Sequence, residues 1–392
     1  MIRFLIIAGV PIGIALQGII EEKSRALSNV CQYGPIVLLA IYGLACQAAA
    51  KFAKHPERLL GQSPMMSVLF LGFALTTCFS LFASGLDLPP GGLRDTMIVG
   101  VTYFALAAPF RWEPRHYHLF SWIHCISFVV LSLVRAGSPA DLNVIEGDSP
   151  WEHHTLGFVL PMCFFYAFLA KDLPLMAFSG CLTILAMKRV AIIAMVISIA
   201  ASFLAPSAKP RALICLILGL VLFLGSHYLD LIIEFLQNTV PEIKDFRDLF
   251  SGRGPLVKTV RETAYAEAGW VNVLFGNGPG FASKLAVELL SAELKHIHND
   301  YIRIFLDYGI VGSVFWLAVL IRLGSMSKLG FCLALYQMTV FSTDNTFVYY
   351  PHLVTLYLFA KLHDLPARAR AGAGIRRQTA GALSPVNQPL YS

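Results

Sequence analysis

One polar stretch of the sequence has residues that could carry out chemistry. The stretch from His296 to Tyr301 reads HIHNDY and lies just before an apolar run. Histidine exchanges a proton near neutral pH and can act as a general base. Asn299 and Asp300 can cap the helix that begins here, and its free N–H groups would favour a nearby phosphate. We expect His298 to be a base acting on an amphiphilic molecule. The simpler alternative is that His298 and Asn299 only cap a helix.

Two further motifs could bind an anion. Lys188 and Arg189 lie in a short connection between two apolar runs, and Arg253 lies in the glycine-rich segment SGRGP at 251–255. Arginine can form bidentate hydrogen bonds with phosphate groups. We expect Lys188 and Arg189 to bind an anion such as a diphosphate, the alternative being contact with lipid headgroups. The glycines around Arg253, like those of FGNGPG at 275–280, also occur in any turn-rich loop.

The composition is that of a membrane protein. Of 392 residues, 56% are hydrophobic and 14% are charged, whereas a soluble chain has roughly 25% charged residues. This composition therefore argues strongly against a soluble enzyme. The net charge of +6 is spread over an apolar chain, which argues against a nucleic-acid-binding face.

The metal-binding residue types do not form a recognisable site. The eight cysteines fall in or beside apolar runs without metal-ligand spacing, so we expect them to be reduced. Glu152, His153 and His154 are adjacent, but neighbouring histidines point to different faces of a helix and a third ligand is not evident. We expect no metal and no cofactor.

Apolar runs approaching the length of about 20 residues that crosses a bilayer recur along the chain. They predict an all-α integral membrane protein with about twelve transmembrane helices, a count uncertain by one or two because several runs are short. The runs centre on Ile6, Leu38, Phe73, Phe104, Phe128, Cys163, Leu182, Met195, Leu218, Val314, Leu335 and Tyr357.

Loop charges predict the topology, because cytoplasmic loops carry an excess of Lys and Arg. With the N-terminus inside, every second loop is basic, and the loops between them are acidic or balanced. The basic loops contain Lys51, Lys54 and Arg58, then Arg111 and Arg115, Lys171, Lys209 and Arg211, and Arg322 and Lys328. Both termini should therefore be cytoplasmic. Lys188 and Arg189 are the exception, a basic pair on the outer side.

The same alternation predicts four segments. Residues 1–233 form transmembrane helices one to nine, and residues 234–301 form a periplasmic loop subdomain that carries the SGR and HN motifs. Residues 302–364 form helices ten to twelve, and residues 365–392 form a disordered cytoplasmic tail. Within the loop, residues 284–294 (KLAVELLSAEL) predict an amphipathic helix at the membrane interface. The loop should cover the membrane body as a lid.

Two smaller polar groups have simpler structural explanations. Asp344 and Asn345 precede the last apolar run, so they could face the same cavity as His298, although a helix cap is the more ordinary role. Asp307-Tyr308-Gly309 lies within a predicted span, where we expect it to serve packing or to end a helix.

The order of these parts resembles the superfamily of O-antigen polymerases and O-antigen ligases of bacterial cell-surface polysaccharide assembly. The resemblance rests on the many spans, the outward pair Lys188-Arg189, the glycine motifs at 251–253 and 276–278, and His298-Asn299-Asp300-Tyr301 followed by Gly309. Its motifs cover roughly residues 178–345. The N-terminal half is similar by hydropathy alone.

The resemblance implies an inverting, metal-independent glycosyltransferase of the GT-C-like kind in the bacterial inner membrane. The substrate would be a glycan linked to undecaprenyl diphosphate at the periplasmic face. His298 would be the base that activates an acceptor hydroxyl, and Arg189 and Arg253 would hold the donor diphosphate. The further binding residues implied are Lys188, His296, Asn299, Tyr301 and Asp344.

Polymerases and ligases share this donor and differ in the acceptor. A polymerase extends a lipid-linked repeat unit, whereas a ligase transfers the polymer to lipid A-core. The run HNDYIR, the following DYG and the pair Asp344-Asn345 look more like the polymerases. Superfamily relatives that glycosylate proteins or export capsular polymers are further alternatives. Expected partners are membrane lipids and a chain-length regulator protein.

Two other classes of protein could have this hydropathy. A secondary transporter would place ionisable residues near the bilayer midplane in repeated halves, but here the polar candidates gather at the outer end and the sequence has no repeat. A scaffold for other enzymes would need neither His298 nor the basic pair. Both are therefore weaker explanations than a transferase.

Overall fold

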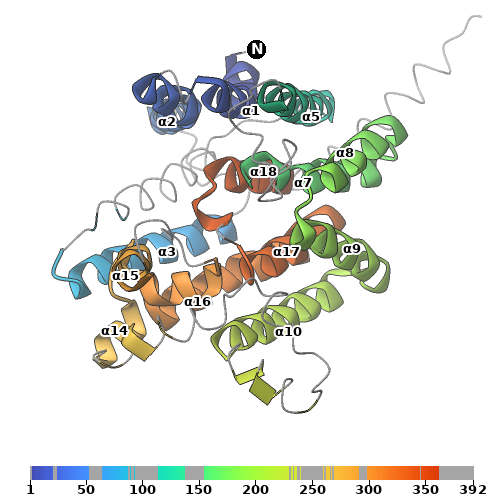
Figure 1. Ribbon diagram of the computed structural model, residues 1–392. Coiled ribbons are helices and arrows are strands. Elements are labelled where there is room, and N and C mark those ends of the chain that lie inside the picture. Colours follow the sequence, from blue (N-terminus) through green and yellow to red (C-terminus); the bar gives the residue numbers. More distant parts are fainter. Residues whose placement is uncertain are drawn as a thin grey trace, which may run out of the picture.

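The computed structural model is helical throughout the part of the chain that it describes (Figure 1). It describes residues 2–20, 24–52, 64–86, 114–136, 154–228, 269–290, 298–344 and 346–361, with a few short pieces elsewhere. The prediction of an all-α protein is confirmed for these residues.

The helices follow the predicted apolar runs closely. Each predicted centre lies in a helix except Phe104, which lies outside the described residues. The helices are α1 (Ile2–Ile20), α2 (Arg25–Phe52), α3 (Pro64–Ala83), α5 (Pro114–Ala136), α6 (His154–Gly157), α7 (Leu160–Ala170), α8 (Leu173–Leu185), α9 (Arg189–Leu204), α10 (Ala208–His227), α14 (Trp270–Phe275), α15 (Phe281–Leu290), α16 (Asp300–Met326), α17 (Lys328–Phe341) and α18 (Tyr350–Lys361), with a 3-10 turn at Thr346–Val348.

Only some of these helices are long enough to cross a bilayer alone. Within the described residues, the segments Arg115–Val134, Ala208–His227 and Asp300–Met326 meet both the length and the hydropathy of a span. Others are apolar but shorter, such as α8 with 13 residues and α9 with 16. The chain is therefore consistent with a multi-pass membrane protein, but several predicted spans are too short to be complete spans of their own.

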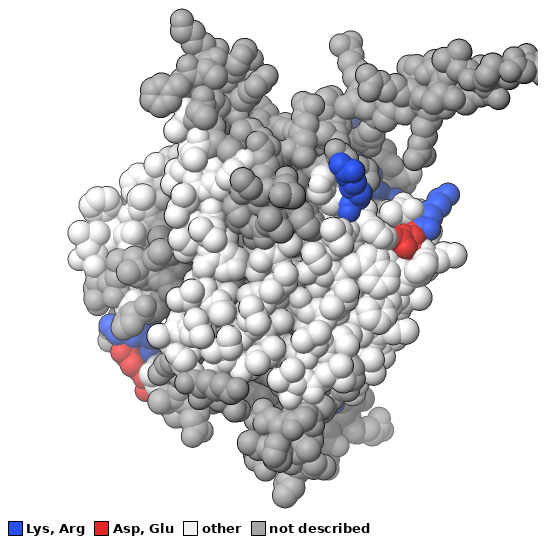
Figure 2. All heavy atoms as spheres, turned by 90° about the horizontal axis from the view of Figure 1, so that it is seen from above, with Lys and Arg blue, Asp and Glu red and all other residues white. Residues whose placement is uncertain are grey.

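The surface of the protein is also consistent with a multi-pass membrane protein. Seen from above, the described charged side chains lie at two opposite edges of the molecule, and a broad uncharged surface extends between them (Figure 2). Many exposed side chains are large and apolar, among them Leu204, Phe203 and Phe82. In water such a surface would be costly. Against lipid it is the expected exterior.

α16, α17, α9 and α10 pack as neighbours around the buried core (Figure 1). The thiol of Cys332 on α17 lies 3.8 Å from the Ser198 carbonyl on α9. The ammonium of Lys328 lies 4.9 Å from the ring centre of Phe203. Because residue numbers rise along α9 as they fall along α17, the two helices are antiparallel. The start of α9 therefore lies at the end of α17.

Several loops that were predicted to lie on the same side of the membrane are found at one end of the body. The Phe168 ring at the end of α7 lies 6.1 Å from the Phe203 ring at the end of α9. Arg211 near the start of α10 donates to the Ser325 carbonyl at 3.3 Å. The connections after α7, between α9 and α10, and between α16 and α17 thus lie at the same end. This grouping agrees with the alternation of loop charges.

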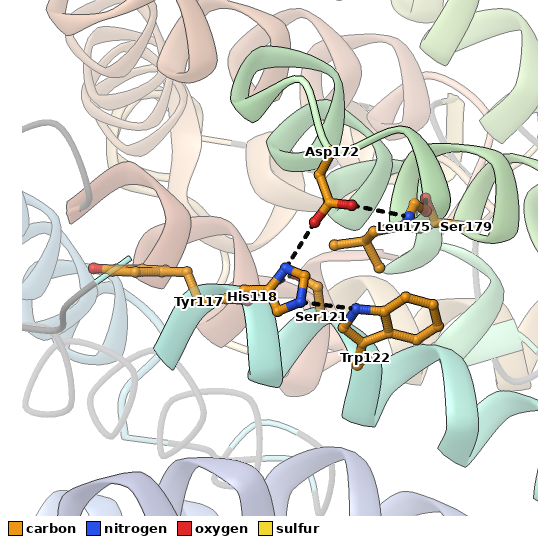
Figure 3. A network of polar contacts seen from close by, with 7 residues as sticks. All are labelled: Tyr117, His118, Ser121, Trp122, Asp172, Leu175 and Ser179. Atoms are coloured by element: carbon orange, nitrogen blue, oxygen red, sulfur yellow. Dashed lines mark hydrogen bonds and ion pairs between the residues drawn. The ribbon is translucent and has the colours of Figure 1, made fainter. Parts of the chain in front are cut away.

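A polar network joins α5 to this same end (Figure 3). His118 Nδ1 lies 2.7 Å from Asp172 Oδ2, and Trp122 donates to His118 Nε2 at 3.1 Å. The other carboxylate oxygen of Asp172 accepts from the Leu175 N–H at 3.2 Å and so caps α8. Because Asp172 begins α8 directly after α7, these two helices form a tight hairpin.

α16 is two helical pieces that meet at Gly309. This glycine has φ 69° and ψ −167°, a combination open to glycine and strained for other residues. A Cβ at Gly309 would lie 2.3 Å from the Leu274 carbonyl oxygen. The prediction that Asp307-Tyr308-Gly309 ends a helix is therefore confirmed.

The backbone of the glycine turn that precedes α15 packs against α16 at the break. The Asn277 N–H donates to the Leu306 carbonyl at 2.9 Å, and the Gly278 N–H donates to the Asp307 carbonyl at 3.2 Å. The Asp307 carboxylate accepts from the Ala282 N–H at 2.8 Å. The helix predicted over 284–294 corresponds to α15, which is described from Phe281 to Leu290; residues 291–294 lie outside the described residues, and its place at the membrane interface stays a prediction. Its first turn is thus anchored to the same strained point of α16.

We expect Gly309→Ala to lower the stability of the protein by about 2 kcal/mol or more, because Ala is strained at this φ and its Cβ would meet backbone. Thermal denaturation in detergent measures the effect. Gly225→Ala is the control, because a Cβ there has no neighbour within 4 Å and Ala favours the interior of α10. Equal denaturation temperatures for the two variants would show that the break does not constrain the fold.

Candidate functional site

His298 and Asp344 lie together at the end of the body opposite the His118 network. His298 Nδ1 is 4.0 Å from Asp344 Oδ1, with 34% of the histidine side chain and 11% of the aspartate side chain exposed. The imidazole is therefore open to solvent while the carboxylate is mostly covered. A carboxylate in this position can orient the imidazole ring.

Asn299 explains why α16 begins where it does. Its backbone is extended, with φ −159° and ψ 104°, and its side-chain oxygen accepts from the Ile302 N–H at 3.2 Å. The predicted cap is therefore confirmed for Asn299. Its amide nitrogen also donates to the Ser342 carbonyl at 3.0 Å, which ties the start of α16 to the end of α17.

Asp300 has a different role from the predicted cap. Its side chain is fully buried, and its Oδ2 accepts from the Phe347 N–H at 2.8 Å and from the Thr346 hydroxyl at 3.2 Å. The carboxylate therefore joins the start of α16 to the turn that follows Asp344. Together with Asn299, it holds the segment carrying His298 against the segment carrying Asp344.

Tyr301 packs beneath this junction. Its hydroxyl donates to the Met338 carbonyl at 3.0 Å, and its ring lies edge-on to Phe223 and Phe341 at 6.1 Å and 5.9 Å. Tyr301 thus helps to place the first turn of α16 on α10 and α17. A contact between Tyr301 and a substrate stays a prediction.

The basic pair is at the same end of the body. Lys188 is the N-cap residue of α9, and Arg189 is its first residue, so both lie where α17 ends and Asp344 follows. The Lys188 side chain is 8% exposed and lies over Gly157, whereas Arg189 is exposed. Two cations, one mostly covered and one exposed, therefore lie at the end of the body that carries His298.

Three of the predicted residues cannot be placed in this way. Arg253, His296 and Asn345 lie outside the described residues. Within the described part of the chain, no group of three or more His, Cys, Asp and Glu side chains is arranged to hold a metal ion. The described candidate groups at this end of the body are thus an imidazole, a carboxylate and two cations.

The sequence did not single out every polar residue at this junction. Asp344 was expected mainly as a cap, yet α18 begins only at Tyr350 and Asp344 lies against His298. Thr346, Gln337 and His352 were missed, although all three are fully buried. A signal was present, because a glutamine and a histidine inside apolar runs need polar partners.

We expect Asn299→Ala to free the first turn of α16 by removing both the cap and the donor to Ser342, at a cost of about 1 kcal/mol for the cap alone. Hydrogen exchange should become faster at residues 300–303 and 342–347. Ser327→Ala is the matched control, because Ser327 caps α17 at the other end of the body by accepting from Gly330 at 2.8 Å. If Asn299→Ala changed exchange only within α16, the tie to α17 would be wrong.

Comparison with known families supports a specific assignment for the middle of the chain. Residues 174–317 match the family model described as Wzy_C: O-Antigen ligase. The match extends from α8 through His298 to the second piece of α16, and it ends before Asp344. No curated protein matches the chain. Residues 174–317 therefore belong to the Wzy_C family of O-antigen ligase domains.

Proposed function

We propose that this protein is a surface-polysaccharide polymerase that transfers a glycan from an undecaprenyl-diphosphate donor to a lipid-linked repeat unit. The His298–Asp344 pair carries the proposal. It is an accessible imidazole beside a covered carboxylate, inside or adjoining a domain whose family transfers glycans. The segments that carry the two partners are joined by hydrogen bonds of neighbouring residues, from Asn299 to Ser342 and from Thr346 to Asp300, and such support is what a catalytic pair requires.

In this mechanism, His298 accepts the proton of the acceptor hydroxyl. The hydroxyl oxygen forms a bond to C1 of the donor sugar from the face opposite the lipid diphosphate, and the C1–O bond to that diphosphate breaks. The configuration at C1 is therefore inverted. Asp344 stabilises the imidazolium that forms, as carboxylates paired with histidine do in other enzymes.

The leaving diphosphate carries away the bonding electrons and needs positive charge nearby. Arg189 can supply a planar guanidinium and Lys188 a second cation, and Arg253 is the third cation that the sequence predicts. Fixed cations can stabilise such a leaving group in a site of low dielectric constant. The proposed chemistry is therefore metal-independent.

The proposal places the site on the periplasmic side of the bacterial inner membrane, with both termini in the cytoplasm. The loop subdomain at 234–301 would then cover the site, and the anchoring of α15 to Asp307 supports a fixed position for its C-terminal part. Residues 1–233 and 302–364 would form the membrane body, and residues 365–392 a disordered tail. A chain-length regulator would be a partner of this assembly.

An O-antigen ligase is the second candidate, because the matching family is described by that activity. The acceptor separates the two functions, and a deletion strain separates the acceptors. A missing polymerase leaves single repeat units on lipid A-core. A missing ligase leaves bare core, with polymer still on the carrier lipid. The proposal predicts single repeats, and bare core would replace the polymerase with the ligase.

We expect His298→Ala to lower the rate of glycan transfer by about 100-fold or more, the usual contribution of a general base. Asp344→Asn should lower the rate by roughly tenfold, because it removes only the charge beside the imidazole. Transfer is measured with purified protein and a lipid-linked donor. His118→Ala is the matched control, because His118 also pairs with an aspartate but at the opposite end. Wild-type transfer by His298→Ala would remove His298 from the mechanism.

We expect Arg189→Gln to raise KM for the lipid-linked donor by about tenfold, the effect of losing a charge-assisted hydrogen bond. Arg189→Lys should recover only part of the loss, because lysine lacks the planar fork. Arg322→Gln, which removes an exposed arginine near the opposite end of α16, should leave KM unchanged. Equal effects of Arg189→Gln and Arg322→Gln would favour general membrane electrostatics over a donor site.

A further inference from the structure

A continuous chain of buried polar side chains leads from the candidate site into the apolar body. It consists of Asp300, Thr346, Gln337 and His352, and each side chain is fully buried. The Thr346 hydroxyl lies 3.2 Å from Asp300 Oδ2, and the Gln337 amide nitrogen lies 3.0 Å from that hydroxyl. The Gln337 carbonyl oxygen contacts His352 Nε2. The chain thus connects α16, α17, the turn after α17 and α18.

The chemistry of the groups fixes the direction of these hydrogen bonds. The Asp300 carboxylate can only accept, so the Thr346 hydroxyl donates to it. The Thr346 oxygen then accepts from the Gln337 amide, which turns the Gln337 carbonyl toward His352. Because that carbonyl can only accept, His352 must carry its proton on Nε2. Three donors therefore point in sequence toward one carboxylate, an arrangement in which each bond strengthens the next.

Aromatic rings surround the His352 end of the chain, whereas the charges of Arg303 and Asp344 act on the Asp300 end. The His352 ring lies edge-on to Phe158 at 6.4 Å and beside Tyr336 at 6.0 Å, and Phe347 follows Thr346 directly. Polar groups in such a place are costly unless they are fully paired. A buried network of this kind can hold its members in one arrangement.

The outer end of this polar chain lies close in sequence to both His298 and Asp344. Asp300 follows His298 by two residues, and Thr346 follows Asp344 by two residues. The hydrogen bond from Thr346 to Asp300 therefore joins the two segments that carry the proposed catalytic pair. We propose that Asp300 and Thr346 are positioning residues, held by Gln337 and His352, which set the separation of His298 and Asp344. This inference rests on the proposed function.

The direct test is Thr346→Val, which removes the hydroxyl and keeps the shape of the side chain. We expect kcat for transfer to fall about tenfold while KM for the lipid-linked donor stays within about twofold. Thr346→Ser restores the hydroxyl and should recover most of the loss. Thr355→Val is the matched control, because Thr355 is equally buried and its hydroxyl donates to the Pro351 carbonyl at 2.7 Å, within α18. It should keep the wild-type kcat.

A double-mutant cycle separates positioning from general support of the fold. If Thr346 acts through the pair, Thr346→Val should cause no further loss of kcat in an Asp344→Asn background. Losses that multiply would overturn the inference. Wild-type kcat in both Thr346→Val and Gln337→Met would overturn it as well, since Gln337→Met breaks the chain at a second point.

A measurement without activity covers variants that fold poorly or turn over slowly. His298→Cys and Asp344→Cys in one chain should form a cross-link with a short bifunctional thiol reagent, detected by peptide mass spectrometry. Adding Thr346→Val should slow its formation severalfold, and an unchanged rate would contradict positioning. If His298→Ala retained wild-type transfer, the proposed function would fail and this inference with it. If His298→Ala is inactive and Thr346→Val is normal, only this inference fails.

Discussion

The arrangement of the site depends on the buried carboxylate of Asp300. A carboxylate without water needs hydrogen bonds, and Oδ2 of Asp300 accepts two, from the Phe347 N–H and the Thr346 hydroxyl, whereas its buried Oδ1 makes none within the described residues. The two bonds to Oδ2 join the start of α16 to the turn after α17. Asn299 adds a second tie through the Ser342 carbonyl. In the proposed account, these bonds set the separation of His298 and Asp344, since both lie on short segments whose neighbours are joined.

A second constraint orients the covering segment. The left-handed backbone at Gly309 lets α16 change direction, and the gap at this point admits the backbone of the glycine turn at 276–280. The Asp307 carboxylate then holds the first turn of α15, and Ser80 on α3 donates to the Asp307 carbonyl. One break in one helix thus links α3, the glycine turn at 276–280 and the start of α15.

The sequence predicted the features that depend on local patterns of residues. It did not predict most of the contacts between residues that are distant in the sequence. Apolar runs located the helices, and the residue type of Asn299 predicted its cap. Loop charges predicted that Lys188 and Arg189 would lie at the end of the body that carries His298. For Asp344 the sequence offered a shared cavity with His298 only as the alternative to a cap, because Asp344 is 46 residues away and reaches His298 only after α16 and α17 have packed. The hydropathy pattern also did not predict that α8 is short. This helix begins at the cap formed by Asp172, which lies directly after α7.

The central claim is that the histidine and the basic pair face the periplasm, where lipid-linked glycans are joined. Labelling of single introduced cysteines with a membrane-impermeant maleimide on spheroplasts tests this directly. His298→Cys and Arg189→Cys should react from the outside, and Arg322→Cys should react only after the membrane is opened. Protection of positions 298 and 189 from the outer reagent, together with labelling of position 322, would contradict the account.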